Sequence, residues 1–531
     1  MNTRVLIENI RTDVSVGDEA IFAVAEKKLR SAGCFGDVSR MVIHRKSIDA
    51  RRREITFVSS VLAEVNYIQI TDEVKLSALG LKLYKVTEPE MPLGTEEMQG
   101  RPVIIGFGPA GIFCALLLAE CGFKPLVLEQ GGNIDQRVQA VNMFSNGGAL
   151  QTNTNIQFGA GGAGTFSDGK LTTRIGDDRC GYVLRRLHEL GAPEDILWRS
   201  KPHVGTDILR DIIRAADTKI HACGGEIRYN TKVEKITDNA VYTAGEKIPF
   251  GSLIIACGHS ARDLYAHLLA GGFHIEPKSF SAGIRIEHLQ NEIDSALYGK
   301  YAGKYGLVHA EYAVSFRQGE RGCYSFCMCP GGEVVAAASE EGGVVTNGMS
   351  HHARDGRNAN AAIAVSVHPF DYGATPAQAI AFQRNLEQAA FAAGGRSYAA
   401  PCQTFGDFVS GKHGTEPKRI IPTYRGGDVV MTDLHSILPG FICSMLETGI
   451  RSFGQKIRGF DAADVPMTGV ETRTSAPIRI LRHDISLCAP GYDRIYPCGE
   501  GAGYAGGIMS AAVDGIRVAQ AILSRFKRPS D

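Results

Sequence analysis

The residues whose types and spacing point most directly to chemistry are three glycines, Gly106, Gly108 and Gly111, in the segment GFGPAG. They form the pattern G-x-G-x-x-G immediately after the apolar run PVII. A carboxylate, Glu129, follows 18 residues after Gly111, at the end of a second apolar run. This context predicts a strand, a dinucleotide-binding turn and a helix. The alternative is a strand-turn-helix unit that holds no ligand.

Each residue of the turn has a physical role in such a site. Gly106 permits a tight turn, Gly108 lets a pyrophosphate approach the backbone, and Gly111 lets the helix pack closely on the strand. The helix N-terminus offers unpaired N–H groups and a partial positive charge to the phosphates. Glu129 is placed to accept hydrogen bonds from ribose hydroxyls. Since its charge disfavours a 2′-phosphate, NADP is not expected at this turn.

A glycine-rich segment near the C-terminus favours FAD over NAD. Gly499 and Glu500 follow the run DRIYPC, where flavoproteins of the glutathione-reductase type contact the ribityl chain or the pyrophosphate. Gly507 and Ile508 begin a predicted helix whose N–H groups could face the flavin pyrimidine ring. A middle segment, LIIACG, resembles the strand that returns to the dinucleotide in these enzymes. The alternative is the last strand and helix of an unrelated α/β domain.

The loop FGAGGAGTFSDGKL, residues 158–171, is too rich in glycine for a regular element. We expect it to wrap the flavin, with Lys170 near N1 or N5, where a cation stabilises the reduced form. The alternative is a flexible surface loop. The loop residues expected to contact the cofactor are Gly162, Gly164, Thr165 and Ser167, and the further expected contacts are Pro109, Ala110, Gln130, Arg137, Val233, Cys257 and Gly258.

Two thiols and a guanidinium are candidates for the chemistry at the substrate end. Cys327 and Cys329 share one face of a predicted strand, and they could act as redox thiols beside the flavin. The spacing C-x3-C-x-C fits no usual zinc or iron–sulfur pattern, and no metal site is predicted. Arg473 could hold a carboxylate substrate. The alternatives are small buried thiols and an ordinary ion pair. With Lys170, these residues form the candidate catalytic set.

The candidate site residues lie on elements whose pattern predicts an α/β body. The parallel βαβ pattern predicts a Rossmann-type FAD-binding domain that is split in the sequence, with an inserted α+β substrate or cap domain. The segment VLIENI, an amphipathic helix and two further strands predict a small, ferredoxin-like N-terminal α+β module. The expected boundaries are 1–88 for this module, 89–101 for a linker, 102–275 and 483–531 for the FAD-binding domain, and 276–482 for the insert.

Composition excludes several classes of partner. The 57 Lys and Arg balance 57 Asp and Glu, so neither a nucleic-acid nor an anionic-membrane surface is expected. The N-terminus lacks the apolar core of a signal peptide, and no apolar run is long enough to span a bilayer. The 13 cysteines, an odd number, are expected to be reduced thiols, which favours a cytoplasmic protein.

Several segments together resemble a known family. GPAGIFCALLLAECG, FGAGGAGTFSDGKL, FCMCPGGEVV, GVETRTSAPIRI and YPCGEGAGYAGGI are similar to segments of a bacterial family of FAD-dependent dehydrogenases, and the likeness extends to SIDAR near the N-terminus. The resemblance implies a single-dinucleotide flavoprotein with a split FAD domain, related in layout to fumarate reductase-like flavoproteins. It implies neither a substrate nor catalytic residues.

The expected function is that of an FAD-dependent oxidoreductase. Hydride would pass through flavin N5 to or from a small organic molecule. The sequence holds no second strand–GxGxxG–helix unit with a following acid, so NADH or NADPH is expected, if at all, as a transient donor. The alternative is a flavoprotein that binds RNA or another partner through its N-terminal module, as in tRNA modification, because a basic turn lies at Arg51–Arg53. That module is not basic overall, with 14 Lys/Arg and 15 Asp/Glu in residues 1–99. The oligomeric state is left open.

Overall fold

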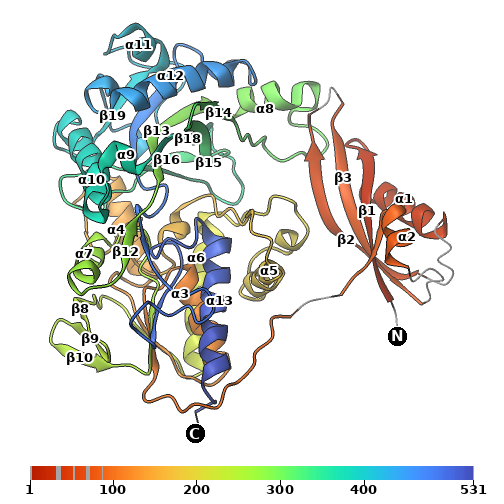
Figure 1. Ribbon diagram of the computed structural model, residues 1–531. Coiled ribbons are helices and arrows are strands. Elements are labelled where there is room, and N and C mark those ends of the chain that lie inside the picture. Colours follow the sequence, from red (N-terminus) through yellow and green to blue (C-terminus); the bar gives the residue numbers. More distant parts are fainter. Residues whose placement is uncertain (1–2, 32–37, 52–53, 67–71, 86–87, 530–531) are drawn as a thin grey trace.

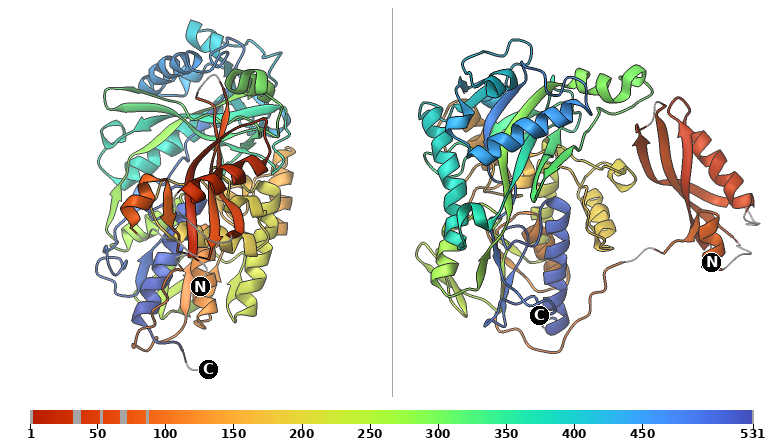
Figure 2. Two further views of the ribbon diagram at one scale, coloured as in Figure 1. Left: turned by 90° about the vertical axis from the view of Figure 1, so that its right-hand side faces the viewer. Right: turned by 45° about the horizontal axis from the view of Figure 1, so that its top comes forward.

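A computed structural model describes residues 3–31, 38–51, 54–66, 72–85 and 88–529. A small N-terminal module lies beside a large α/β body that is formed by the rest of the chain (Figure 1). The right view of Figure 2 shows this module to one side of the body, and the left view, turned by 90°, shows it in front of the body. Among the described residues, no helix is both long and apolar enough to cross a membrane.

The N-terminal module is a four-stranded antiparallel sheet covered by helices on one face (Figure 1). Its elements are β1 (Thr3–Asp13), α1 (Asp18–Ser31), β2 (Val38–Asp49), β3 (Thr56–Val65), α2 (Glu73–Ala78) and β4 (Leu81–Leu83), and the sheet order is β2-β3-β1-β4. Side chains of β3 alternate between buried and half-buried, as expected for a strand with one face on a core. The sequence predicted the first three strands and α1. The short α2 and β4 carry too few residues to show a periodic pattern.

Backbone hydrogen bonds join the module and the segment after it to the body. Lys46 N–H donates to the Trp198 carbonyl at 2.9 Å, and Ser200 N–H donates to the Lys46 carbonyl at 3.0 Å. Further along the chain, Gly94 N–H donates to the Leu523 carbonyl at 2.8 Å. The segment 89–101, predicted as a linker, therefore follows the C-terminal helix closely.

The body is built on a five-stranded parallel sheet in the order β23-β11-β5-β6-β7. The strands are β5 (Pro102–Ile105), β6 (Leu126–Leu128), β7 (Glu226–Arg228), β11 (Ser252–Ile255) and β23 (Ile495–Pro497). All but the edge strand β7 are buried along their whole length, which explains why they read as uninterrupted apolar runs. Strand β23 comes from near the C-terminus and pairs with β11, so the sheet is completed by two distant parts of the sequence.

Both faces of this sheet are covered. One face packs against α3 (Pro109–Glu120), α6 (Thr206–Ala222) and α13 (Ile508–Arg525), with α5 (Arg179–Glu189) outside them. The other face packs against α7 (Arg262–Ala270) and an antiparallel sheet of β8 (Lys235–Ile236), β9 (Ala240–Thr243) and β10 (Glu246–Pro249). Helix α3 is buried along nearly all of its length, because it lies between the sheet and α13.

A second, seven-stranded sheet forms the upper part of the body in Figure 1. Its order is β14 (Ser315–Gln318), β15 (Arg321–Cys329), β18 (Asn358–Val367), β13 (Phe280–Leu289), β21 (Pro466–Glu471), β19 (Ala400–Thr404) and β20 (Val429–Met431). The helices of this part are α8 (Gln290–Tyr298), α9 (Pro369–Tyr372), α10 (Pro376–Ala393), α11 (Phe405–Ser410) and α12 (Gly440–Gly454).

Two short pairs of strands complete the body. Strands β12 (Ile275–Pro277) and β22 (Ile478–Ile480) pair antiparallel where the chain enters and leaves the upper part. Strands β16 (Glu333–Ala336) and β17 (Thr346–Met349) form a ribbon that packs with α4 (Ile134–Ser145), a helix of the lower part. The two parts of the body therefore share a continuous interior, and the candidate site lies where they meet.

Candidate functional site

A pocket opens at the carboxyl ends of β5, β6 and β11, where ligands bind in open parallel sheets. The lower part of the body contributes the GFGPA turn, the loop 157–170, the segment 256–264 and the start of α13. The upper part contributes residues from three separate segments of its sheet and loops. These are Phe326, Cys327, Asn347, Glu471, Arg473 and Thr474.

Most of the residues predicted for the site line this one pocket. They are Gly106, Gly108, Pro109, Ala110, Glu129, Gln130, Gly162, Gly164, Ser167, Lys170, Val233, Cys257, Gly258, Cys327, Arg473, Glu500, Gly507 and Ile508. Five predicted residues are placed behind the wall, as far as the described chain shows, and these are Gly111, Arg137, Thr165, Cys329 and Gly499.

The glycines of the turn are needed for two different reasons. Gly106 has φ of +100°, and a Cβ there would lie 2.4 Å from the Ala256 carbonyl oxygen. A Cβ on Gly111 would lie 2.0 Å from the Gly106 carbonyl oxygen, so only glycine lets α3 pack against its own strand end. Gly111 thus acts behind the pocket wall, in the packing role that the sequence pattern assigns to it.

Glu129 ties three loops together at the pocket wall. Its carboxylate accepts backbone hydrogen bonds from Phe107 at 2.8 Å, Gly131 at 2.9 Å and Gly159 at 3.0 Å. The side chain is buried, yet it borders the pocket. The predicted contact with a ribose therefore stays a prediction, and Glu129 has a structural role in addition.

Arg137 and Thr165 require a correction. Both were expected to contact the cofactor, but Arg137 is wholly buried and donates to five backbone carbonyls of residues 155–162 and to Thr165 Oγ1 at 3.1 Å. A guanidinium can satisfy many carbonyls of an irregular loop at once, because its five N–H groups spread in one plane. These residues therefore fold the glycine-rich loop from behind. Burial lowers the pKa of Arg137 to about 9.

Two helices begin at the pocket. Pro109 and Ala110 start α3, and Gly507 and Ile508 bracket the start of α13. A Cβ added to Gly507 would meet no atom within 4 Å, so this glycine keeps the space in front of α13 clear. Two helix N-termini, each with a partial positive charge, fit the pyrophosphate of a dinucleotide and the electron-rich end of a reduced flavin. The chain therefore offers a built site for FAD.

Lys170 reaches the pocket from the end of the glycine-rich loop. Its Nζ lies 2.7 Å from Asp168 Oδ2 and 3.4 Å from Glu311 Oε1, and Arg354 pairs with the same two carboxylates. Burial lowers the pKa of Lys170, but the carboxylates of Asp168 and Glu311 outweigh it and raise the pKa above its ordinary value. Lys170 is therefore held as a cation at the wall.

Arg473 lines the pocket, and it also makes an ion pair, which was the alternative to a carboxylate-binding role in the sequence analysis. It donates to Glu387 at 2.9 and 3.1 Å and to Ser339 Oγ at 2.6 Å. Arg262 binds the same Glu387 carboxylate through two hydrogen bonds of 2.8 Å. Burial opposes ionisation of Glu387, but the two guanidinium groups hold its pKa well below the usual range. One buried carboxylate thus fixes two cations beside the pocket.

Sequence reasoning missed a second buried pair, Arg285 and Glu471. Arg285 donates to Glu471 at 2.8 and 3.0 Å, to Asn347 Oδ1 at 3.1 Å and to the Cys327 carbonyl at 2.8 Å. The signal was present in the sequence, because Arg285 lies inside the apolar run FSAGIRI, and a charge in a fully buried strand needs a partner.

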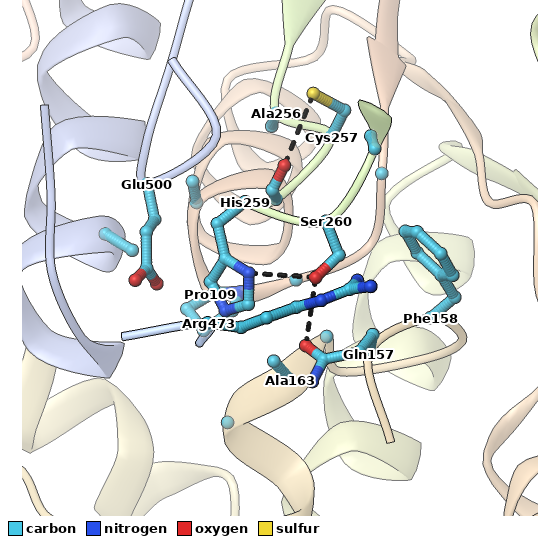
Figure 3. A pocket seen from close by; sticks show the side chains of 18 of the residues that line it. Pro109, Gln157, Phe158, Ala163, Ala256, Cys257, His259, Ser260, Arg473 and Glu500 are labelled. Carbon is cyan, nitrogen blue, oxygen red and sulfur yellow. Dashed lines mark hydrogen bonds between the residues drawn. The ribbon is translucent and has the colours of Figure 1, made fainter. Parts of the chain in front are cut away.

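The floor of the pocket carries a hydrogen-bonded chain that the sequence also did not reveal (Figure 3). Ser260 Oγ lies 2.9 Å from His259 Nδ1 and 3.2 Å from Gln157 Oε1, and Arg473 passes beside this chain. Burial, with help from Arg473, lowers the pKa of His259 to about 3, so the ring is neutral. Glu500 faces the chain across the pocket, and burial raises the pKa of its carboxyl to about 7.

Cys327 and Cys329 differ in position, although the sequence predicted one shared face. Cys327 lines the pocket and Cys329 is fully buried behind it. The register of β15 against β18 is broken between Phe326 and Cys329, so the simple alternation of a strand does not hold there.

Comparison with known proteins places the chain in a family. Residues 279–474 match the family described as "FAD-dependent protein, C-terminal domain-like". An uncharacterized protein of Clostridium beijerinckii is 44% identical over 509 residues, which cover 93% of this chain and 94% of that protein.

Solved structures of low identity were also found. Glycine oxidase from Geobacillus kaustophilus is 10% identical, with 80% of this chain and 96% of that one covered, at a TM-score of 0.36. Halogenase PltM in complex with phloroglucinol and FAD is 13% identical, with coverage of 81% and 71%, at a TM-score of 0.36.

The turn, the two helix N-termini and the matched domain define a flavoprotein. The chain belongs to the same family of FAD-dependent proteins as the Clostridium beijerinckii protein, and FAD is its cofactor. The resemblance noted in the sequence is thereby confirmed.

Proposed function

We propose that the protein transfers a hydride between flavin N5 and a small organic substrate that binds where the two parts of the body meet. The observation that carries this proposal is the continuity of the pocket. The lower part of the body lines the pocket with the dinucleotide turn at Gly106 and Gly108, and the upper part lines the same pocket with Asn347 and Arg473. A pocket of this kind can hold a flavin and a second molecule against it.

FAD, when bound, supplies the capacity to accept or donate two electrons with a proton. The chain's own residues supply its setting. Lys170 and the N-terminus of α13 place positive charge where the reduced flavin is electron-rich. Arg473 keeps two N–H donors beyond the three used by Glu387 and Ser339, and these can orient a carboxylate.

The proposal includes a division of the chain. We assign 102–275 and 483–531 to the FAD-binding domain and 276–482 to the substrate or cap domain, since the chain enters and leaves the upper part through the β12–β22 pair. The family match at 279–474 falls inside that insert. Residues 1–88 are assigned a ferredoxin-like fold, a proposal that the sheet order β2-β3-β1-β4 supports.

The alternative of an RNA-binding N-terminal module receives little support from its described residues. Arg51 binds Asp49 at 2.8 Å, and Lys46 binds Asp18 at 2.6 Å. Basic side chains that are engaged within the module are less free to neutralise phosphates. Arg52 and Arg53 of the basic turn lie outside the described residues.

The test of the proposed function is anaerobic reduction of the bound flavin, followed by its absorbance. The full chain, purified with FAD, is mixed with NADH, NADPH and a panel of organic acids, and the reduced protein is then mixed with enoates. Bleaching by one donor and reoxidation by one acceptor are the expected results. A protein that is purified colourless, and stays so when incubated with FAD, would falsify the proposal.

A further inference from the structure

The thiols of Cys327 and Cys329 occupy an unusual place in β15. Phe326 pairs with Ala362 and Cys329 pairs with Asn360, so two residues of β15 stand opposite one of β18. The extra residue has φ of +43° at Cys327, in a region that residues other than glycine rarely adopt. This bulge redirects the Cys327 side chain into the pocket while Cys329 stays in the core.

The two residues are linked by a hydrogen bond, and two cations interact with Cys327. Cys329 Sγ donates to the Cys327 carbonyl oxygen at 3.3 Å, and Arg285 Nη1 donates to the same oxygen at 2.8 Å. Lys170 and Arg285 both act electrostatically on Cys327, and they reach it from opposite parts of the body. Arg285 is fully buried, so its charge is little screened.

These contacts make the two thiols chemically different. A hydrogen bond from Cys329 lowers the pKa of Cys327 below its ordinary value, with help from Arg285 and Lys170 and against the effect of burial. The hydrogen bond to Cys327 and burial raise the pKa of Cys329 well above its ordinary value. Among the cysteines that the structure describes, Cys327 alone has a lowered pKa, whereas burial raises the pKa of Cys257, in the same pocket, to about 12.

We propose that Cys327 and Cys329 form a redox couple that exchanges one electron pair with the flavin. Cys327 is the thiol that faces the pocket, and Cys329 is the buried thiol that completes the disulfide. The inference rests on the proposed function in one respect, because the flavin is the oxidant of the dithiol. It adds a second redox centre to the FAD site.

The step balances in electrons and protons. The Cys327 thiolate and the Cys329 thiol form an S–S bond, and two electrons and the proton of Cys329 leave together. Oxidised flavin takes up the two electrons and that proton and becomes the anionic reduced flavin. The reverse step breaks the S–S bond and returns a thiolate at Cys327 and a thiol at Cys329. A thiolate and a buried proton donor are the two forms that this step requires.

The first test counts electrons in the full chain loaded with FAD. The protein is oxidised with ferricyanide, freed of the oxidant and titrated anaerobically with dithionite. We expect the wild type to take up two electron pairs per flavin, and Cys327→Ser and Cys329→Ser to take up one. Cys180→Ser is the control, because this thiol of α5 lies outside the residues that line the pocket, and it should take up two.

The second test reads the disulfide directly, without activity. Trypsin releases residues 322–354, which contain Cys323, Cys327 and Cys329 as their cysteines. Alkylation in denaturant followed by mass spectrometry should find one modified cysteine in this peptide after oxidation and three after reduction. In the folded, reduced protein, alkylation of Cys327 should rise to its maximal rate at a lower pH than alkylation of Cys257.

The outcomes separate the two proposals. Wild-type protein that takes up one electron pair per flavin, or shows three modified cysteines after oxidation, overturns the dithiol couple even if its flavin is reduced normally. Uptake of two electron pairs per flavin by the wild type, and of one by each of the two cysteine variants, supports the dithiol couple. A chain that binds no flavin overturns both the couple and the proposed function. A second electron pair with no reaction toward any organic donor or acceptor supports the couple and contradicts the hydride transfer.

Discussion

Arg473 donates two hydrogen bonds to Glu387, and the carboxylate that receives them is shared with Arg262. Arg473 comes from the loop after β21, Glu387 from α10, and Arg262 from the first turn of α7. One buried carboxylate therefore joins the lower part of the body to the upper part at the edge of the pocket. The relationship links the stability of the fold to the shape of the site.

Replacement of this carboxylate should be costly. Glu387→Gln leaves the buried Arg473 without its counter-ion and leaves Arg262 with only the more exposed Glu340, 3.2 Å away, so we expect a loss of about 3–5 kcal/mol in the free energy of unfolding. Because the folded pKa of Glu387 is depressed, its contribution is full above pH 4.5 and is lost as the pH falls below that value. Denaturant unfolding between pH 3 and 8 measures both effects. Glu340→Gln, at a more exposed carboxylate of the same cluster, should lose about 1 kcal/mol or less, and equal losses would refute the argument.

Arg137 should control FAD binding without touching the cofactor. Arg137→Met removes the donors to the carbonyls of residues 155–162, so the glycine-rich loop loses its shape. We expect FAD affinity to fall at least tenfold and the free energy of unfolding of the apo protein to fall by about 2–4 kcal/mol. Fluorescence titration with FAD and denaturant unfolding provide the measurements. Arg214→Met, at an exposed ion pair, should change neither, and a normal affinity in Arg137→Met would show that the loop folds without it.

Gly111, behind the pocket wall, and Gly506, which lines the pocket, should respond differently to a methyl group. In Gly111→Ala the Cβ would stand 2.0 Å from the Gly106 carbonyl oxygen, so α3 must shift and both stability and FAD binding should be lost. In Gly506→Ala the Cβ meets nothing within 4 Å, so the apo protein should unfold within about 1 kcal/mol of wild type while FAD binds more weakly. Thermal unfolding with and without FAD distinguishes the two. Equal destabilisation of both apo variants would contradict the packing role of Gly111.

The dinucleotide turn was readable in the sequence because its signals are local. Gly106, Gly108 and Gly111 lie within six residues, and the strands beside them are buried on both faces and therefore apolar throughout. The position of Glu500 followed from the same kind of pattern. For these residues a short segment determines the geometry, so type and spacing suffice.

Local patterns could indicate that Arg285 is buried, but they could not predict its partner in the charge network. Arg285 and Glu471 are far apart in the sequence, and they meet because β13 pairs with β21. The same limit explains Arg137, which the sequence analysis expected to contact the cofactor. Only the path of the loop 155–165 shows that this guanidinium is surrounded by carbonyls instead. Cys327 is a third case, since alternation along a strand does not foresee a bulge.

Lys170 should set the potential of the flavin. Lys170→Met removes a cation that neighbouring carboxylates keep protonated, so the anionic reduced flavin loses stabilisation. We expect the midpoint potential to fall by about 30 mV, which corresponds to roughly 1.4 kcal/mol for a two-electron couple. Equilibration with reference dyes, with the flavin spectrum as readout, measures the shift. Lys201→Met removes an exposed charge from the same cluster and should shift the midpoint potential less. Equal shifts in the two variants would contradict a position of Lys170 beside the flavin.

Glu500 should oppose folding of the apo protein at neutral pH. Because burial raises the pKa of its carboxyl from 4.5 to about 7, ionisation costs stability that is absent below pH 4.5 and complete above pH 7. Glu500→Gln should therefore stabilise the apo protein at pH 8, by up to about 3 kcal/mol, and leave it unchanged at pH 4.5. The same variant should bind FAD more weakly if Glu500 contacts the ribityl chain or the pyrophosphate, as the sequence predicts. Denaturant unfolding of the apo protein at both pH values tests the first effect. Glu129→Gln is the contrasting variant. The Glu129 carboxylate accepts three backbone hydrogen bonds, so its loss should destabilise the protein. A Glu500→Gln variant that is equally stable to wild type at pH 8 would show that water reaches this carboxyl freely in the apo pocket.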